Sequence, residues 1–177
     1  MENSSTTKSV LILSDSHAHT ELDFLEDLEV VPDQIWHAGD IGDLLVTDKL
    51  AAIAPTKAVY GNIDGMEIRR CFPEYECFRS GGLKVLMIHI GGRPGRYSPQ
   101  ATKLIQSLKP DIFICGHSHI CRVERDKRFG MLYINPGAIG ISGFHKFRTC
   151  ILLRIEKGKP SSIRVLEYPR SAKIPKN

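Results

Sequence analysis

Five short apolar runs, each followed by Asp, Asn or His, constrain the fold of this chain most strongly. The runs and the polar residues after them are 10–13 with Asp15 and His17, 34–36 with His37 and Asp40, 58–60 with Asn62, 85–88 with His89, and 112–115 with His117 and His119. Short apolar runs closed by Gly and polar residues are typical of buried strands. In open α/β sheets, residues just beyond the carboxyl ends of the strands gather at one edge, where such folds place their sites. The pattern predicts an α/β fold with one polynuclear metal centre.

The first half of the chain alternates these strands with predicted helices. Leu22, Leu25 and Leu28 recur every three residues and predict a helix over 20–29. Two more helices are expected over 44–53 and over 99–108, the latter with Ser98 as N-cap and Pro99 at the first helical position. Alternation of this kind favours parallel strands with helices on their faces.

The second half contains consecutive strands. A hairpin is expected over 75–89, and further strands over 120–124, 131–134, 149–155 and 162–166, separated by Gly-containing turns. Consecutive strands without helices predict antiparallel pairing in a second sheet. The two halves together predict a four-layer αββα sandwich of two mixed β-sheets flanked by helices.

Length and composition are those of one globular domain of 177 residues, with residues 1–8 as a flexible lead-in. No apolar stretch approaches the roughly 20 residues needed to span a bilayer, and the polar start lacks the apolar core of a secretory signal. Five cysteines without a CxxC pair argue against a disulfide framework. A cytoplasmic location is therefore expected, with no membrane partner.

The net charge of +4 is mild, and the basic residues cluster at one place only. Arg122, Arg125, Lys127 and Arg128 alternate with Val, Glu and Asp ahead of Phe129-Gly130. This alternation favours an exposed hairpin over a nucleic-acid-binding patch.

Seven of the strand-end residues are candidate metal ligands: Asp15, His17, Asp40, Asn62, His89, His117 and His119. Asp15 and His17 are two positions apart, as are His117 and His119, so in an extended segment both members of a pair point the same way. Seven ligands are too many for one transition metal with an open position, but they suit two divalent ions sharing a bridging carboxylate. Mixed oxygen and nitrogen ligands favour Mn, Fe, Co, Ni or Zn over Mg or Ca, and we expect Mn²⁺.

The charge of this centre indicates the substrate. Two divalent ions bring four positive charges, and Asp15 and Asp40 return only two negative ones. The net positive centre suits a small anionic phosphate ester, and paired ions lower the pKa of a shared water. The sequence therefore predicts phosphoester hydrolysis.

The ordered motifs Asp15-x-His17, Gly39-Asp40-x-x-Asp43, Gly61-Asn62-x-Asp64, His89 and Gly116-His117-x-His119 resemble those of the calcineurin-like metallophosphoesterase superfamily. The chain length and the Asn135-Pro136-Gly137 turn are similar to its small bacterial and archaeal phosphodiesterase branch. The resemblance covers residues 9–155. It implies hydrolysis of phosphodiesters by attack of a metal-bridging hydroxide.

The resemblance also implies a role for each residue. Asp15, His17 and His119 would bind one ion, Asn62, His89 and His117 the other, and Asp40 would bridge them. Asp43 and Asp64 would orient the ligands from behind. Sheet edges and apolar helix faces in this branch often support dimers or tetramers, so the resemblance is consistent with a homo-oligomer and leaves the oligomeric state open.

Two departures from the superfamily pattern stand out. Ile63 occupies the position where many members carry a His that protonates the leaving group, so no side-chain general acid is evident and good leaving groups should react best. The branch often has His-Gly-His where this chain has His89 followed by a Gly-rich segment with Arg93 and Arg96. These arginines are expected either to bind a second phosphate or the distal part of the substrate, or to lie in a solvated loop.

Other interpretations concern the remaining histidines and the absence of catalysis. His19, His37 and His145 are expected to be structural or surface residues, with His37 ending a strand beside the site.

The alternative to an enzyme is a catalytically weak metal-binding scaffold, because the retromer scaffold subunit resembles the same branch. A scaffold can lose ligands without penalty, whereas all seven are present here. A nuclease is disfavoured, because neither a basic groove nor a large capping domain is evident.

Overall fold

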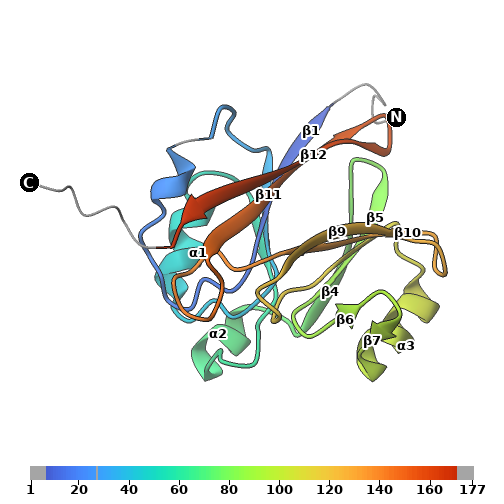
Figure 1. The fold of residues 1–177 in the computed structure, drawn as a ribbon, viewed down its shortest axis with the longest axis horizontal. Coiled ribbons are helices and arrows are strands. Elements are labelled where there is room, and N and C mark those ends of the chain that lie inside the picture. Colours follow the sequence, from blue (N-terminus) through green and yellow to red (C-terminus); the bar gives the residue numbers. More distant parts are fainter. Residues whose placement is uncertain (1–6, 27, 171–177) are drawn as a thin grey trace, which may run out of the picture.

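The computed structural model describes residues 7–26 and 28–170 and contains two five-stranded sheets (Figure 1). The first has the strand order β12-β11-β1-β2-β3. Its strands are β1 (Lys8–Leu13), β2 (Gln34–His37), β3 (Thr56–Ala58), β11 (Phe147–Glu156) and β12 (Lys159–Pro169). β1, β2 and β3 are parallel, whereas β11 runs antiparallel to both β1 and β12.

The second sheet has the order β4-β5-β8-β10-β9. Its strands are β4 (Tyr75–Ser80), β5 (Leu83–Ile88), β8 (Ile112–Ile114), β9 (Cys121–Asp126) and β10 (Met131–Pro136). β5, β8 and β10 are parallel, and the edge strands β4 and β9 pair antiparallel with their neighbours. A separate two-stranded hairpin consists of β6 (Gly92–Arg93) and β7 (Arg96–Tyr97).

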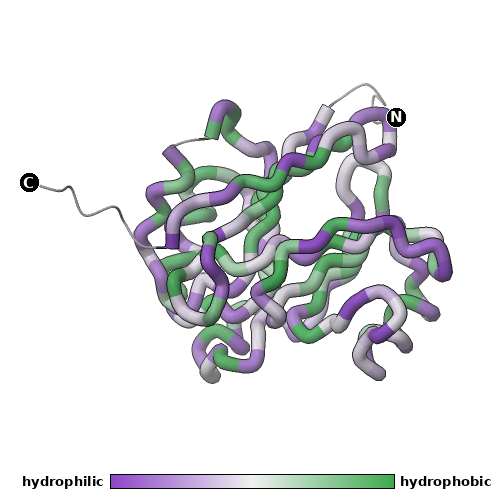
Figure 2. Tube along the Cα trace, in the orientation of Figure 1, coloured by the Kyte–Doolittle hydropathy of each residue, from purple (hydrophilic) through white to green (hydrophobic). Residues whose placement is uncertain are grey.

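The two sheets pack face to face around a buried apolar core. Val10 and Trp36 of the first sheet share this core with Val85, Met87 and Ile114 of the second. The neighbouring residues in β1 face the other side of their sheet, as the two-residue period of a strand requires. Both faces of the central strands are therefore buried, and Figure 2 shows hydrophobic residues along them.

Helices cover the outer faces. On the first sheet these are the 3₁₀ turn η1 (Asp23–Leu25), α1 (Leu44–Ala51) and α2 (Met66–Cys71), and on the second α3 (Pro99–Leu108). The helices expected over 44–53 and 99–108 are confirmed, with Ser98 accepting a hydrogen bond from the Ala101 amide as N-cap of α3. The four-layer αββα sandwich is confirmed. Within the described ranges, no helix has the length and apolar character needed to cross a membrane.

The helix expected over 20–29 is wrong, because the structure has only the η1 turn there. Leu22, Leu25 and Leu28 do pack against the core of the first sheet. Their spacing of three residues matches the period of a 3₁₀ turn better than the 3.6 residues of an α-helix. Asp27 lies outside the described residues.

The sheet assignment of the last two strands is also wrong. β11 and β12 were expected in the second sheet, but β11 pairs with β1, with Val10 opposite Leu153, and so extends the first sheet. Of the four strands expected after His119, only β9 and β10 join the second sheet, beside β4, β5 and β8. β11 thus lies beside β1, although the two strands are far apart in sequence, and β12 lies on the other side of β11.

The remaining elements agree with the sequence or add to it. The basic cluster lies on the exposed β9–β10 hairpin, as predicted, and β9 is hydrophilic in Figure 2. α2 and the β6–β7 hairpin were not predicted. Most of the lead-in expected over residues 1–8 lies outside the described residues, and β1 begins at Lys8.

Candidate metal centre

The seven candidate ligands follow the carboxyl ends of five strands. Asp15 and His17 follow β1, Asp40 follows β2, Asn62 follows β3, His89 follows β5, and His117 and His119 follow β8. Backbone bonds tie these segments together beyond the strands: the amides of Asp15 and His17 donate to the carbonyls of Gly39 and Asp40, and that of Gly116 to His89. The five segments therefore meet at one edge, where the two sheets face each other.

Five of the seven residues have a left-handed backbone. Their φ angles are 55° for Asp15, 48° for His17, 54° for Asp40, 70° for His117 and 58° for His119. The extended segments assumed for the pairs Asp15/His17 and His117/His119 are therefore wrong, because these residues have a left-handed backbone. Non-glycine residues in this region cost about 1–3 kcal/mol each and cluster at functional sites.

The first cluster joins Asp15, His17 and His119. The Nε2 atoms of the two imidazoles lie 3.3 Å apart. Asp15 Oδ1 lies 3.1 Å from His119 Nε2 and 3.7 Å from His17 Nε2. Ligands bound to one ion at about 2.0–2.2 Å lie roughly 2.8–3.6 Å from one another. Two of the three separations fall in this range and the third exceeds it by about 0.1 Å, so the three atoms are spaced close to the ligands of a single ion.

The second cluster joins Asp40, His89 and His117. Asp40 Oδ1 lies 3.2 Å from His89 Nε2. The other oxygen of the same carboxylate, Oδ2, lies 3.5 Å from His17 Nε2 in the first cluster. Asp40 therefore has one oxygen directed to each cluster, which is the arrangement of a bridging carboxylate.

The charges of the two clusters are coupled. Burial opposes ionisation of Asp15, but the neighbouring imidazoles of His119 and His17 hold its pKa well below the usual range. Burial also raises the pKa of Asp40, and His89 lowers it. The net result is a pKa below the usual value of an aspartate. Conversely, the Asp15 carboxylate raises the pKa of His17. For His89, burial lowers the pKa, but Asp40, Asp15 and the Ala38 carbonyl together outweigh it and raise the pKa. The site therefore favours the ionised, negatively charged forms of Asp15 and Asp40 with positively charged groups beside them.

Two buried polar atoms test whether the site fits metal ions. Asp15 Oδ1 and His89 Nε2 have no hydrogen-bond partner in the described part of the chain. Buried polar atoms are usually paired, and an unpaired one calls for an explanation such as a bound ion. His89 Nδ1 donates to the Ala38 carbonyl at 2.7 Å, so its Nε2 presents a lone pair to the site. The donor set and its orientation fit divalent cations.

Asp64 supports the site through the backbone. Its carboxylate accepts hydrogen bonds from the amides of Ile41 (3.1 Å), Gly42 (2.7 Å) and Gly61 (2.7 Å). It therefore fixes the segments that carry Asp40 and Asn62, rather than an imidazole directly. Asp43, which was expected to orient ligands, instead caps α1 by accepting from the Leu45 amide.

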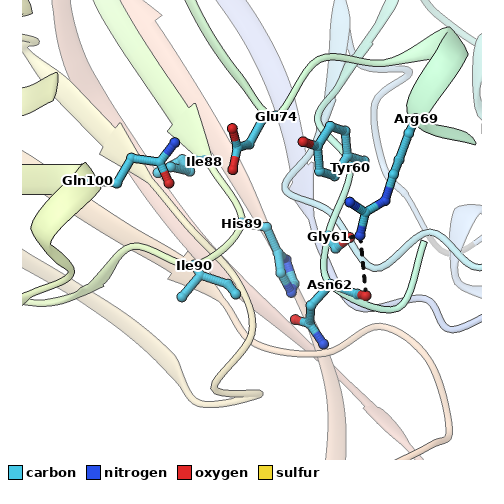
Figure 3. Close-up of a pocket in the computed structure, with 9 residues that line it drawn as sticks. All are labelled: Tyr60, Gly61, Asn62, Arg69, Glu74, Ile88, His89, Ile90 and Gln100. Atoms are coloured by element: carbon cyan, nitrogen blue, oxygen red, sulfur yellow. Dashed lines mark hydrogen bonds between the residues drawn. The ribbon is translucent and has the colours of Figure 1, made fainter. Parts of the chain in front are cut away.

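Asn62 lies beside His89, and both line a cavity of about 190 Å³ (Figure 3). Arg69 of α2 holds the Asn62 segment in place. Its Nε donates to the Asp64 carbonyl at 2.6 Å, its Nη2 lies near the Gly61 and Asn62 carbonyls, and its guanidinium stacks on the Tyr60 ring. Arg69 was not predicted from the sequence, because α2 is short and has no periodic apolar pattern.

Asn135 supports the opposite side of the site. Its Nδ2 donates to the Gly116 carbonyl at 2.9 Å and to Ser118 Oγ at 3.1 Å, while its Oδ1 accepts from the Gly137 amide. It thereby fixes the segment between His117 and His119. A signal for this role was present, since the Asn-Pro-Gly sequence stands at the end of β10.

Glycines precede two of the ligands because the backbone approaches the carboxylates closely. A Cβ at Gly61 would lie 2.1 Å from Asp40 Oδ1, and one at Gly116 would lie 2.6 Å from Asp15 Oδ2. Any larger residue would displace these carboxylates.

The other histidines lie around the site. His37 is buried at the end of β2, where its Nε2 donates to Ser16 Oγ, and burial lowers its pKa to about 4. His19 accepts from Arg148. His145, expected outside the pocket, lines a cavity with His117 and His119, and its ring centroid lies 5.3 Å from that of His119.

Comparisons with known proteins agree with this geometry. The model of the calcineurin-like phosphoesterase superfamily domain matches residues 9–158. A probable metallophosphoesterase of Mycoplasma pneumoniae is 30% identical over 167 residues, which cover 91% of this chain and 98% of that protein. A probable metallophosphoesterase of Methanothermobacter thermautotrophicus is 30% identical over 141 residues, covering 72% and 74%.

Among solved structures, that of wild-type Vps29 from Entamoeba histolytica complexed with Zn²⁺ has the same fold. The TM-score is 0.69 at 20% identity, and the match covers 92% of this chain and 99% of that one. Fold and site thus define a metallophosphoesterase. The chain belongs to the calcineurin-like phosphoesterase superfamily.

Proposed function

We propose that this protein is a phosphodiesterase that works with two divalent metal ions. The observation that supports the proposal most directly is the position of Asp40, whose two oxygens face the two clusters at 3.2 and 3.5 Å. Asp15, His17 and His119 would hold one ion, Asn62, His89 and His117 the other, and Asp40 would bridge them. When bound, such ions supply Lewis acidity and lower the pKa of a bound water.

The residues of the chain supply positioning and charge. Two carboxylates leave a centre of two divalent ions net positive, which favours an anionic phosphate ester. The preference for diesters, Mn²⁺ as the metal, a cytoplasmic location and a homo-oligomeric state come from the resemblance and the composition, and remain predictions.

The leaving group has no side-chain acid at position 63. Ile63 is 47% exposed beside the site, and an alkyl side chain cannot donate a proton. We therefore expect activated aryl esters to react far better than alkyl esters.

The test uses protein stripped with EDTA and reloaded with Mn²⁺, with bis(4-nitrophenyl) phosphate and 4-nitrophenyl phosphate as substrates. We expect metal-dependent hydrolysis, faster for the diester, that Asp40→Ala and His117→Ala abolish. Asp48→Ala, on the exposed face of α1, is the matched control and should retain activity. Metal-loaded protein inert towards both substrates would refute the enzyme and favour a metal-binding scaffold on the same fold.

A further inference from the structure

The β6–β7 hairpin places two arginines in the wall of a second cavity that reaches the metal centre. This cavity of about 440 Å³ is lined by Arg93, Arg96 and Arg122, and also by His117 of the second cluster. Its volume is in the range of small-molecule binding sites. The cavity therefore connects a candidate metal ligand to a cationic wall.

Arg93 and Arg96 are direct cross-strand partners. The Pro94-Gly95 turn joins them, with Gly95 at φ 82° as the third position of a type II turn requires. Directly opposed residues have Cβ atoms about 4.5–5.5 Å apart on one face, and like charges in that position repel each other. The hairpin thus holds two cations together at an energetic cost.

No acidic side chain of the described residues compensates these charges. Neither Arg93 nor Arg96 forms an ion pair there, and no Asp or Glu lines the cavity. Arg122, in contrast, pairs with Glu124 at 2.6 Å. Two adjacent, unpaired guanidinium groups suit a phosphate dianion, which accepts several charge-assisted hydrogen bonds.

Apolar side chains also line this cavity. Ile90 and Ile120 line the cavity with exposed fractions of 44% and 66%, together with the ring of Tyr97. Such a surface fits a sugar or base rather than another charged group.

We propose that this cavity binds the distal end of the substrate, and that this end carries a second phosphate. The substrate class is then a nucleotide-like phosphodiester with a terminal phosphate, its scissile phosphate at the metal centre and its terminal phosphate between Arg93 and Arg96. The position of the scissile phosphate rests on the proposed function. The subsite for the terminal phosphate does not depend on it.

The kinetic test compares thymidine 5′-(4-nitrophenyl phosphate) with the same compound carrying a 3′-phosphate, using the Mn²⁺-loaded full chain. Wild type should have a kcat/KM at least about tenfold higher for the 3′-phosphorylated compound. Arg93→Ala and Arg96→Ala should each reduce this ratio severalfold, and the double variant should bring it to about one. Arg154→Ala, on β11 opposite Ser9 at the start of β1 and so at the other end of that strand from Asp15, should keep the wild-type ratio.

A binding test separates this proposal from the proposed function. Titration of thymidine 3′,5′-bisphosphate into the metal-free protein should give a dissociation constant that the double variant weakens at least about tenfold. A wild-type ratio near one, or an equal loss in Arg154→Ala, would overturn the subsite. If neither ester is hydrolysed, the proposed function fails, and the titration alone decides: equal affinity in wild type and double variant would then overturn the subsite too.

Discussion

His17 and His119, which are 102 positions apart in sequence, direct their Nε2 atoms at each other across 3.3 Å. Two neutral imidazole nitrogens at this distance either share a proton or repel each other through their lone pairs. Asp15 Oδ1, buried beside them without a hydrogen-bond partner, adds negative charge at the same point. A cation between the three atoms removes the conflict.

We therefore expect metal binding to stabilise the fold. At a Mn²⁺ concentration of about 100 Kd the gain is about 2.7 kcal/mol, which raises Tm by roughly 5–10 °C for a chain of this size. Differential scanning fluorimetry of EDTA-stripped and reloaded protein measures this shift. His119→Ala should lose most of it, while His19→Gln, a histidine that faces Arg148 instead, should retain it. An equal shift in wild type and His119→Ala would contradict the assignment.

Arg69→Ala should weaken the second metal site selectively. The guanidinium holds the carbonyls around Asn62 and Asp64, and losing such a supporting contact lowers metal affinity about 10–100-fold. Calorimetric titration with Mn²⁺ should change from two tight sites to one tight and one weak site. Arg70→Ala, next along the same helix and exposed, is the matched control. Two unchanged tight sites in Arg69→Ala would show that the Asn62 segment holds its position without this arginine.

Ile63→His should increase turnover of poor leaving groups. The Ile63 amide, not its side chain, donates to Asp40 Oδ1 at 3.1 Å, so the substitution preserves that contact. A general acid contributes about 10²–10⁴-fold when well placed, and we expect at least about tenfold for phenyl relative to 4-nitrophenyl diesters. Ile63→Gln, of similar size without an acidic proton, should leave this ratio unchanged. A loss of bound metal in Ile63→His would show that residue 63 contributes more than its backbone.

His37 should make the metal-free protein less stable in mild acid. Its pKa is about 4 in the folded state, because burial disfavours the charged form, against an ordinary value of 6.5. A depressed pKa stabilises the fold above pH 6.5, and this stability is lost as pH falls from 6.5 to about 4, up to about 3 kcal/mol. Urea unfolding of wild type and His37→Gln should therefore differ in pH dependence over this window.

The comparison needs a reference at pH 8, where His37 is neutral, so that the intrinsic effect of the substitution is subtracted. Expressed relative to that value, the wild-type curve should fall more steeply than the curve of His37→Gln. Parallel curves would mean that His37 is accessible to protons in the folded state.

The sequence by itself determined which residue types follow which strands. Apolar runs such as 10–13 and 112–115 are local patterns, and the polar residues after them are fixed by the chain order. Because neighbouring parallel strands end at a common edge, Asp15 lies near Asp40 and His89 near His117 within their own sheets. The meeting of these two pairs required the packing of the two sheets. The cap of α3 could also be predicted, since Ser98 stands immediately before Pro99 at the start of the helix. The capping of α1 by Asp43 was not predicted, because the motif around Asp40 favoured a role beside the metal ligands.

Only the tertiary structure decided how the ligand residues are divided between the two clusters and which other residues hold them in place. The left-handed turns at Asp15 and His17, the pairing of β11 with β1, and the contact of Arg69 with the Asn62 segment depend on residues that are distant in sequence or have no periodic pattern. The same holds for the Arg93–Arg96 hairpin, which only the folded chain brings to the same cavity as His117. Local periodicity reports which face of an element is buried. It does not report which other element covers that face, because this depends on the packing energy of the whole chain.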